Sequence, residues 1–224
     1  MLNLNYTLFE VLGYPLGLIE TAGTISGILS VALAIRSNRL SWLVGMINIL
    51  ASFILFYQVG LYSGMILQVY FLGTGIYGWF FWKSSGQSVM PVTVLTKRQR
   101  LTYLAIILAA AYWVAQGMIY IQNDWPNWFP VAVAFPFWDA LAMVAGMFAN
   151  WFMARRKLEN WSIWLTVDIL YVLMYVAQEI YLYALLYFVF CIMAILGWNQ
   201  WKKERMAFLI IHQEETLPGD SAME

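Results

Sequence analysis

Seven long apolar runs separated by short polar segments dominate the chain and limit what it can fold into. A helix needs about 20 apolar residues to cross the ~30 Å hydrocarbon core of a bilayer. The runs are approximately Val11–Ile35, Trp42–Gly60, Ser63–Trp82, Leu101–Ile121, Pro130–Ala154, Trp161–Ala177 and Tyr181–Trp201. Hydrophobic residues make up 62% of the chain and charged residues 11%, which excludes a soluble globular domain, a disordered chain and a coiled coil. The sequence therefore predicts an all-α membrane protein with seven transmembrane helices.

The basic residues all fall on one side of this seven-span arrangement. The 12 Lys and Arg residues lie between spans one and two, three and four, and five and six, and after span seven. The other connecting segments and the N-terminus contain none, and they include the tight turns Gly60–Tyr62 and Gln178–Ile180. Because Lys and Arg collect on the cytoplasmic side, we expect the N-terminus outside and the C-terminus in the cytoplasm. The tail from His212 onward is expected to be disordered.

An internal repeat relates the two ends of the chain. A shift of 119 positions without a gap superposes the motif Gly-Trp-x-x-Trp at 78–82 and 197–201, four identical residue pairs and one pair of acids. The pairs are Trp42 and Trp161, Tyr62 and Tyr181, Gly27 and Gly146, Arg36 and Arg155, and Glu20 and Asp139. Spans one to three thus align with spans five to seven. Because span four adds one crossing, both triplets enter the membrane in the same direction, as in SWEET-type transporters.

This parallel 3+1+3 plan divides the chain into four parts. They are a first repeat (11–82), a cytoplasmic loop with connector helix four and an outer loop (83–129), a second repeat (130–201) and a tail (202–224). Repeats of this kind form a transport site at their interface near the middle of the membrane.

Asp168 is the most informative polar residue inside a span. Trp161, Trp164, Asp168, Tyr171 and Tyr175 follow one another at steps of three and four and therefore share one helix face. A flat organic cation can lie on such rings by cation–π attraction, and the carboxylate can neutralise its charge. The alternative is that Asp168 bonds a neighbouring Tyr or Ser hydroxyl and only holds helices together. Because ionisable residues in a membrane span are usually functional, we favour the binding role.

Other intramembrane polar residues add to the candidate site. Asn48 and Gln68 come from the first triplet, whereas Tyr187 comes from the second. Glu20 and Asp139 occupy equivalent positions in the two repeats, which favours a structural role over the coupling of a cation. The aromatic residues near the basic ends of spans three and seven are predicted to be membrane-interface anchors. They are Trp79, Trp82, Trp198 and Trp201.

Several chemistries are absent from the pattern. Haem ligation and a rhomboid-like serine protease need an intramembrane His, and the only His lies in the tail. A retinal Schiff base needs a membrane Lys, and the spans contain none. An aspartyl protease with Asp139 and Asp168 remains a remote alternative without the Gly-x-Gly-Asp context of that class. We expect no cofactor, no metal site and, at zero net charge, no nucleic-acid partner. The single Cys191 is interpreted as a small buried hydrophobe.

Four stretches resemble the PnuC family of bacterial vitamin transporters. They are residues 20–27 (ETAGTISG), 67–79 (LQVYF followed by IYGW), 135–139 (FPFWD) and 159–164 (ENW through Trp164). The resemblance covers nearly all of residues 15–201 in order. It implies an inner-membrane transporter rather than an enzyme, working by facilitated diffusion. It also implies trapping of the vitamin by a cytoplasmic kinase, and a homotrimer.

The substrate is the open point of this resemblance. The best-known branch carries nicotinamide riboside, and sister branches carry thiamine and riboflavin. The resemblance implies that nicotinamide riboside transporters have an Asn where this chain has Asp168. An ionised Asp only accepts hydrogen bonds, which suits the thiazolium cation and the aminopyrimidine N–H donor of thiamine. We therefore favour thiamine, with the equally cationic nicotinamide riboside second and neutral riboflavin third. A membrane receptor that transports nothing is the alternative of another class.

Overall fold

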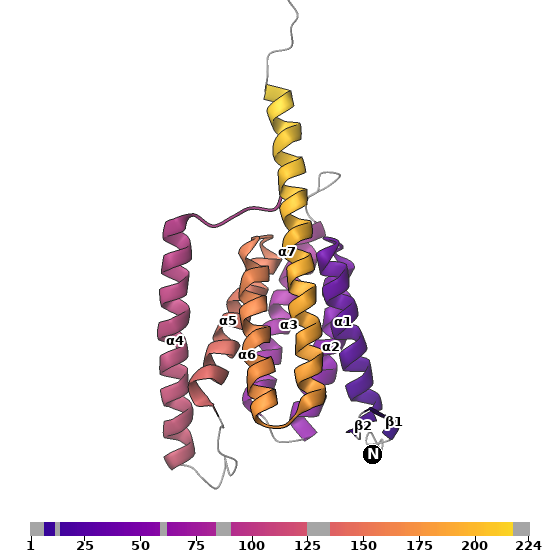
Figure 1. The fold of residues 1–224 in the computed structure, drawn as a ribbon, viewed down its shortest axis with the longest axis vertical. Helices are drawn as coiled ribbons and strands as arrows, with labels where there is room; N and C mark the ends of the chain where they lie inside the picture. The colour runs from indigo at the N-terminus through magenta and orange to yellow at the C-terminus, as the bar shows by residue number, and fades with distance from the viewer. Residues whose placement is uncertain (1–6, 12–13, 59–61, 84–90, 125–134, 217–224) are drawn as a thin grey trace, which may run out of the picture.

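The structure is a computed structural model that describes residues 7–11, 14–58, 62–83, 91–124 and 135–216. These residues form a short antiparallel hairpin and seven α-helices (Figure 1). The elements are β1 (Thr7–Val11), β2 (Tyr14–Gly17), α1 (Leu18–Ile35), α2 (Leu40–Gln58), α3 (Tyr62–Lys83), α4 (Lys97–Asp124), α5 (Pro136–Ala154), α6 (Glu159–Ala177) and α7 (Tyr181–Thr216).

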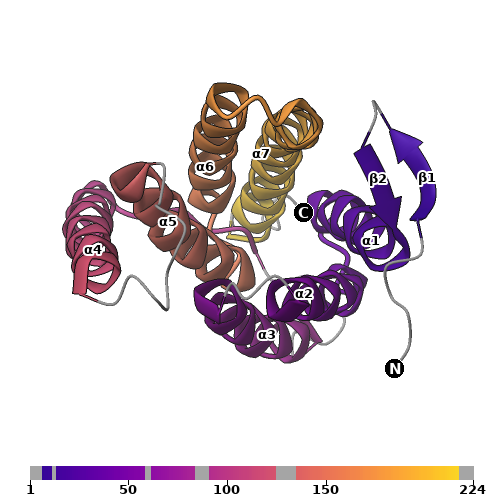
Figure 2. The same cartoon turned by 90° about the horizontal axis from the view of Figure 1, so that it is seen from below.

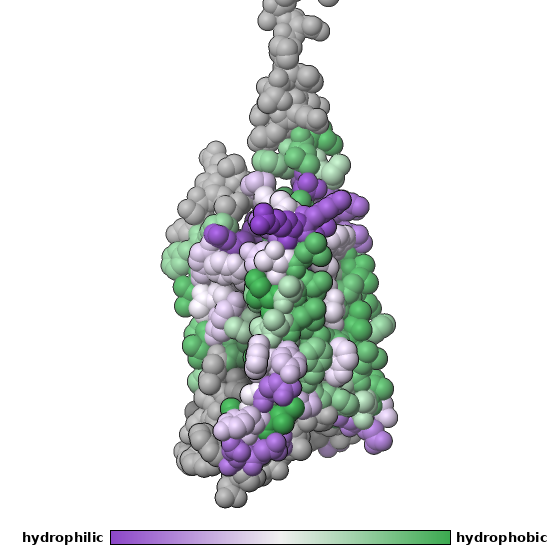
Figure 3. All heavy atoms as spheres, turned by 90° about the vertical axis from the view of Figure 1, so that its left-hand side faces the viewer, coloured by the Kyte–Doolittle hydropathy of each residue, from purple (hydrophilic) through white to green (hydrophobic). Residues whose placement is uncertain are grey.

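The helices have the length and the surface of membrane-spanning segments. Among the described residues, α1, α4, α5, α6 and α7 are long and apolar enough to cross a bilayer, and α2 contains a shorter apolar stretch, Leu40–Leu55. Large apolar side chains face outward, such as Leu101 at 70% exposure and Leu173 at 61%. Figure 3 shows a broad hydrophobic surface with a band of hydrophilic residues across its upper part. A lipid environment explains this exposure, because soluble monomers rarely leave so much apolar surface in water.

The N-terminal residues depart from the all-α prediction. Val11 was expected inside the first helix, but it lies in β1 opposite Tyr14 in β2. Pro15 lacks the N–H that a helix interior needs, and α1 begins only at Leu18. There the Gly17 N–H donates to the Glu20 carboxylate over 2.9 Å, which caps the helix. The predicted start of the first span was therefore wrong by seven residues.

The C-terminal helix is longer than the sequence suggested. α7 continues from Tyr181 to Thr216, although the span was expected to end at Trp201. The residues just after Trp201 are good helix formers, among them Lys202, Lys203 and Met206. Residues 212–216, which were predicted to be disordered, are therefore helical. The rest of that tail, the turn at 59–61 and the predicted start of span five at Pro130 lie outside the described residues.

Six helices form two groups, and α4 stands beside them (Figure 2). Helices α1, α2 and α3 pack in chain order, as do α5, α6 and α7. The groups meet where α3 contacts α5 and where α1 contacts α7, whereas α4 packs on α5 through Ile107, Ala111 and Ala115. The Lys and Arg residues lie at the upper end of the bundle in Figure 1, where α1 and α5 end and α2, α4 and α6 begin. We call this the basic end.

The same side-chain contacts occur in both groups at positions 119 residues apart. Trp42 packs edge-on against Trp82 at a centroid distance of 5.4 Å, and Trp161 packs edge-on against Trp201 at 5.5 Å. The rings of Trp42 and Trp161 each also lie against a glycine. A Cβ added at Gly78 would lie 2.5 Å from Trp42, and one added at Gly197 would lie 2.6 Å from Trp161. These four contacts use the positions that the 119-residue shift aligns.

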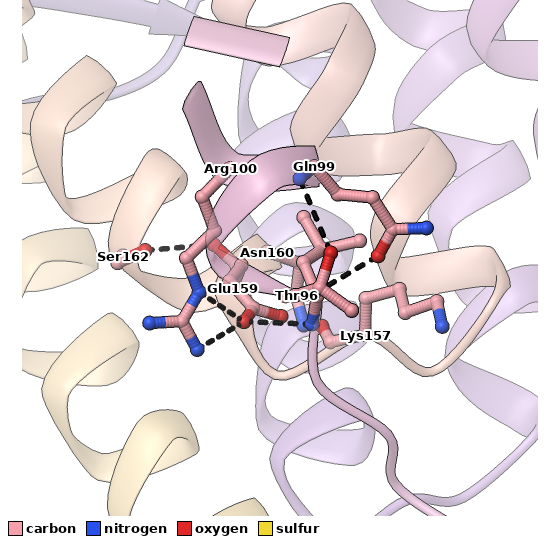
Figure 4. A network of polar contacts seen from close by, with 8 residues as sticks. Thr96, Gln99, Arg100, Lys157, Glu159, Asn160 and Ser162 are labelled. Carbon is pink, nitrogen blue, oxygen red and sulfur yellow. Dashed lines mark hydrogen bonds and ion pairs between the residues drawn. The ribbon is translucent and has the colours of Figure 1, made fainter. Parts of the chain in front are cut away.

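The segment before α4 is fastened to the turn between α5 and α6. Thr93 pairs with this turn through two backbone hydrogen bonds, to Arg156 O (3.0 Å) and from Leu158 N (2.9 Å). Glu159 then accepts from the backbone N–H of Leu95 and forms an ion pair with Arg100 (2.7 Å; Figure 4). Because Glu159 is buried, this charge-assisted contact positions the first turn of α4 against α6.

Candidate functional site

Asp168 lies near the middle of α6 and is buried at 5% exposure. Its carboxylate is within electrostatic range of Tyr171 on the same helix and of Tyr187 and Cys191 on α7. In the part of the chain that the structure describes, no hydrogen bond or ion pair reaches this carboxylate. A buried acceptor without a partner is costly. The position is therefore suited to a ligand that brings a donor or a positive charge.

Tyrosine rings from α6 and α7 gather beside this carboxylate. Tyr171 and Tyr187 have ring centroids 4.7 Å apart, and Tyr175 stacks on both, at 6.0 Å and 5.5 Å. Tyr183 continues the cluster at 5.6 Å from Tyr175. The predicted stripe on α6 thus meets a second stripe on α7, and the rings extend from Asp168 toward the end opposite the basic end. Such π-faces attract flat organic cations.

Trp164 lies one helical turn from Asp168 and contributes a donor. Its six-membered ring rests on α5 at Gly146, where an added Cβ would lie 3.7 Å from the ring. The indole N–H is buried and has no hydrogen-bond partner within the described ranges. Trp164 and Asp168 therefore present one unpaired donor and one unpaired acceptor on neighbouring turns, a combination that can fix the orientation of a polar ligand.

Trp161, also on the predicted stripe, lies apart from this cluster. Its ring is 1% exposed, with one face on Gly197 and its neighbour Trp201 edge-on. Only its unpaired indole N–H remains for a ligand. The ring therefore belongs to the packed core at the basic end.

The two polar residues expected from the first group differ in their surroundings. Asn48 donates from Nδ2 to the backbone carbonyl of Gly23 over 2.7 Å, so its amide already joins α2 to α1. Gln68 is buried on α3 and forms no hydrogen bond to another described residue. The 119-residue shift aligns Gln68 with Tyr187, which lies beside Asp168. Gln68 is thus the stronger candidate for a ligand contact from this group.

The remaining intramembrane acids lie in the first turns of α1 and α5. Glu20 accepts the Gly17 N–H and caps α1. Asp139 is within electrostatic range of Tyr175 and also of Tyr171, the tyrosine that Asp168 reaches as well. Among the described residues, no three His, Cys, Asp or Glu side chains come together to hold a metal ion.

Comparison with known proteins gives the family. The sequence model described as "Nicotinamide mononucleotide transporter" matches residues 17–203, which is most of the chain. The chain belongs to this family.

Curated members of the family are named as transporters. The nicotinamide riboside transporter PnuC of Escherichia coli is 29% identical, over 84% of this chain and 87% of its own length. The riboflavin/roseoflavin transporter RibM of Streptomyces davaonensis is 25% identical, over 81% and 83%. The crystal structure of the vitamin B3 transporter PnuC superposes with a TM-score of 0.63 at 21% identity, covering 84% of this chain and 82% of that one, and it shows the same fold. This PnuC-family chain is therefore a multi-pass inner-membrane protein and not an enzyme.

Two neighbours of the site were not singled out by the sequence pattern. Cys191 was interpreted only as a buried hydrophobe, yet from α7 it lies within electrostatic range of Asp168. Gly146 was noted only as a repeat match, yet the ring of Trp164 lies against it. For Cys191, the only signal would have been an alignment of α6 against α7 across the tight turn at Glu179. The sequence alone does not show how these two helices pack.

Proposed function

We propose that this PnuC-family protein takes up a cationic B vitamin and that the vitamin binds between the two groups of helices, against Asp168. The observation that carries the proposal is the buried carboxylate, which has no partner among the described residues, together with the Trp164 N–H, which has none there either, and the tyrosine cluster. A cation supplies the counter-charge that this position lacks, and the aromatic rings hold a flat heterocycle.

Thiamine is the substrate we propose first. Its cation pairs with the carboxylate, and its aminopyrimidine N–H donates to an acceptor that a carboxylate always offers. Nicotinamide riboside is the second candidate, because it is also a cation and the Escherichia coli relative is named for it. Riboflavin comes third. The relative RibM is named for it, but a neutral ring gains least from Asp168.

The transport route follows from the repeat. The proposed plan is two parallel three-helix repeats with α4 as connector, the N-terminus outside and the basic end in the cytoplasm, and the clustering of Lys and Arg supports this orientation. The paired contacts of Trp42 and Trp161 support this arrangement. The vitamin crosses by facilitated diffusion along the repeat interface, and phosphorylation by a cytoplasmic kinase traps it. The assembly is a homotrimer by family resemblance.

Isothermal titration of purified variants tests the site. Asp168→Asn keeps the shape and removes the charge, so thiamine binding should weaken by about 1–3 kcal/mol, roughly 5- to 150-fold. Trp164→Ala should weaken the binding of both cations because a ring face is lost. Glu20→Gln likewise removes one carboxylate charge, in the first turn of α1, and serves as the matched control with unchanged affinity. If a folded Asp168→Asn protein binds thiamine as tightly as the parent does, Asp168 is structural and the preference for thiamine fails.

A further inference from the structure

Arg156 is a buried charge at the basic end, and the vitamin site does not use it. It lies in the turn between α5 and α6 and is 3% exposed. Its guanidinium carbon lies 5.2 Å from the ring centre of Trp82 and 5.1 Å from that of Trp201. One nitrogen, Nη2, donates to Glu204 Oε2 and to Ser37 Oγ, both over 3.0 Å. Ser37 Oγ in turn donates to Glu204 over 2.7 Å.

These contacts join the two groups of helices. Ser37 follows α1 and Trp82 lies in the last turn of α3, whereas Arg156, Trp201 and Glu204 belong to the second group. Two further hydrogen bonds cross between the groups at the same place. The indole N–H of Trp82 donates to the last carbonyl of α5, at Ala154, and that of Trp201 donates to Ala34 near the end of α1, both over 3.0 Å.

Ser37 and Arg156 occupy equivalent turns. They are 119 residues apart, and both have left-handed backbone angles, with φ of 54° and 52°. Each turn repeats the same hydrogen bonds, from Asn38 N to Leu33 O and from Lys157 N to Phe152 O. Two equivalent residues that touch each other must lie beside the axis that relates the two groups. The path between the groups therefore meets the Ser37–Arg156 contact when it reaches the basic end.

The turn that contains Arg156 is also fixed by contacts with the segment that precedes α4. The backbone of Thr93 pairs with this turn, and Glu159 anchors the start of α4 next to it (Figure 4). A left-handed conformation costs a non-glycine residue free energy and persists only where its surroundings impose it. Burial lowers the pKa of the Arg156 guanidinium below its ordinary value, and the Glu204 carboxylate offsets part of this effect.

We propose that Arg156 is the central residue of a gate that closes the basic end of the transport path. Its guanidinium blocks the path between the indoles of Trp82 and Trp201, and its contacts with Glu204 and Ser37 hold it in this closed position. Release of cargo toward the cytoplasm requires the guanidinium to leave this position and the two indole hydrogen bonds to break. The proposal rests on the proposed passage of a vitamin between the helix groups, but it does not depend on which vitamin passes.

The single cysteine of the chain makes the gate measurable without substrate. Cys191 is buried within electrostatic range of Asp168, and it lies ten residues before Trp201 on α7, about 15 Å farther from the basic end. The reagent is 2-(trimethylammonium)ethyl methanethiosulfonate, a small thiol-reactive cation that does not cross membranes. It is applied to inside-out and to right-side-out vesicles, and the rate of Cys191 modification is measured by mass spectrometry. Because no vitamin is present, a failure of the gate is distinguishable from a failure of the proposed substrate.

Arg156→Ala should speed modification from the basic end by at least about tenfold, which corresponds to about 1.4 kcal/mol. Glu204→Gln should also speed the modification of Cys191 from the basic end, and it disturbs the fold less. If Arg156→Ala does not fold, the rate in Glu204→Gln tests the gate. Arg36→Ala is the matched control, because Arg36 lies exposed in the equivalent turn, and its rate should equal that of the parent. A faster reaction from the opposite face would overturn the assignment of the gate to the basic end. Folded Arg156→Ala and Glu204→Gln proteins that react at the parent rate from both sides would overturn the gate itself.

Discussion

Gly197 offers the sharpest test of how the basic end is packed. A Cβ added there would lie 2.6 Å from three carbons of the Trp161 indole, whereas ordinary carbon contacts are about 3.5–4.0 Å. The ring must therefore retreat by about 1 Å. It has little room to do so, because Trp161 is 1% exposed and abuts Trp201, which is 0% exposed. Overpacking of this kind costs about 1–3 kcal/mol.

Gly73 provides the matched control for Gly197→Ala. An added Cβ at Gly73 meets nothing within 4 Å, although this glycine also lies inside a helix. Both substitutions gain the same helix propensity, about 1 kcal/mol. The difference between their free energies of unfolding therefore isolates the steric cost, and Gly197→Ala should be about 1–3 kcal/mol less stable than Gly73→Ala. The measurement is reversible unfolding in detergent, with thermal stability as a second readout. Equal stabilities would refute the contact between Gly197 and Trp161.

Two other predictions concern the frame around the site. Trp201→Phe keeps a ring in the core but removes the hydrogen bond to Ala34, so it should lower stability by about 1 kcal/mol, measured by the same unfolding assay. In a Cys191→Ala background, a cysteine at Asn123 should react with an impermeant maleimide in intact cells and one at Lys202 should not, and the reverse pattern would contradict the proposed orientation.

The helical part of the fold could be predicted because the apolar runs and the one-sided Lys and Arg residues each restrict it. The start of the first helix could not be predicted. Val11 is apolar whether it lies in a helix or in a strand, and the hairpin depends on its pairing with Tyr14. Trp82 and Trp201 were predicted to be interface anchors, and this was wrong for Trp201, which is fully buried. Tryptophan near a span end is typical of an interface, and only packing reveals that these rings enclose a charge.

The candidate site was predictable to the extent that helical spacing determines it. Asp168, Trp164 and Tyr171 share a face of α6, and the structure keeps them together. Contacts between helices were not predictable in the same way. Nothing in the sequence separates Arg156, which is buried between two indoles, from its exposed neighbour Arg155. The role of Asp168 in binding stays a prediction.

Uptake into proteoliposomes tests the central claim most directly. The purified protein is reconstituted, and labelled thiamine and labelled nicotinamide riboside are offered in parallel, first with no ion gradient and then with an imposed sodium or proton gradient. We expect thiamine to enter until its concentrations are equal on both sides, and Asp168→Asn to slow this entry while Glu20→Gln does not. Entry of neither vitamin, or uphill accumulation driven by an ion gradient alone, would contradict the account.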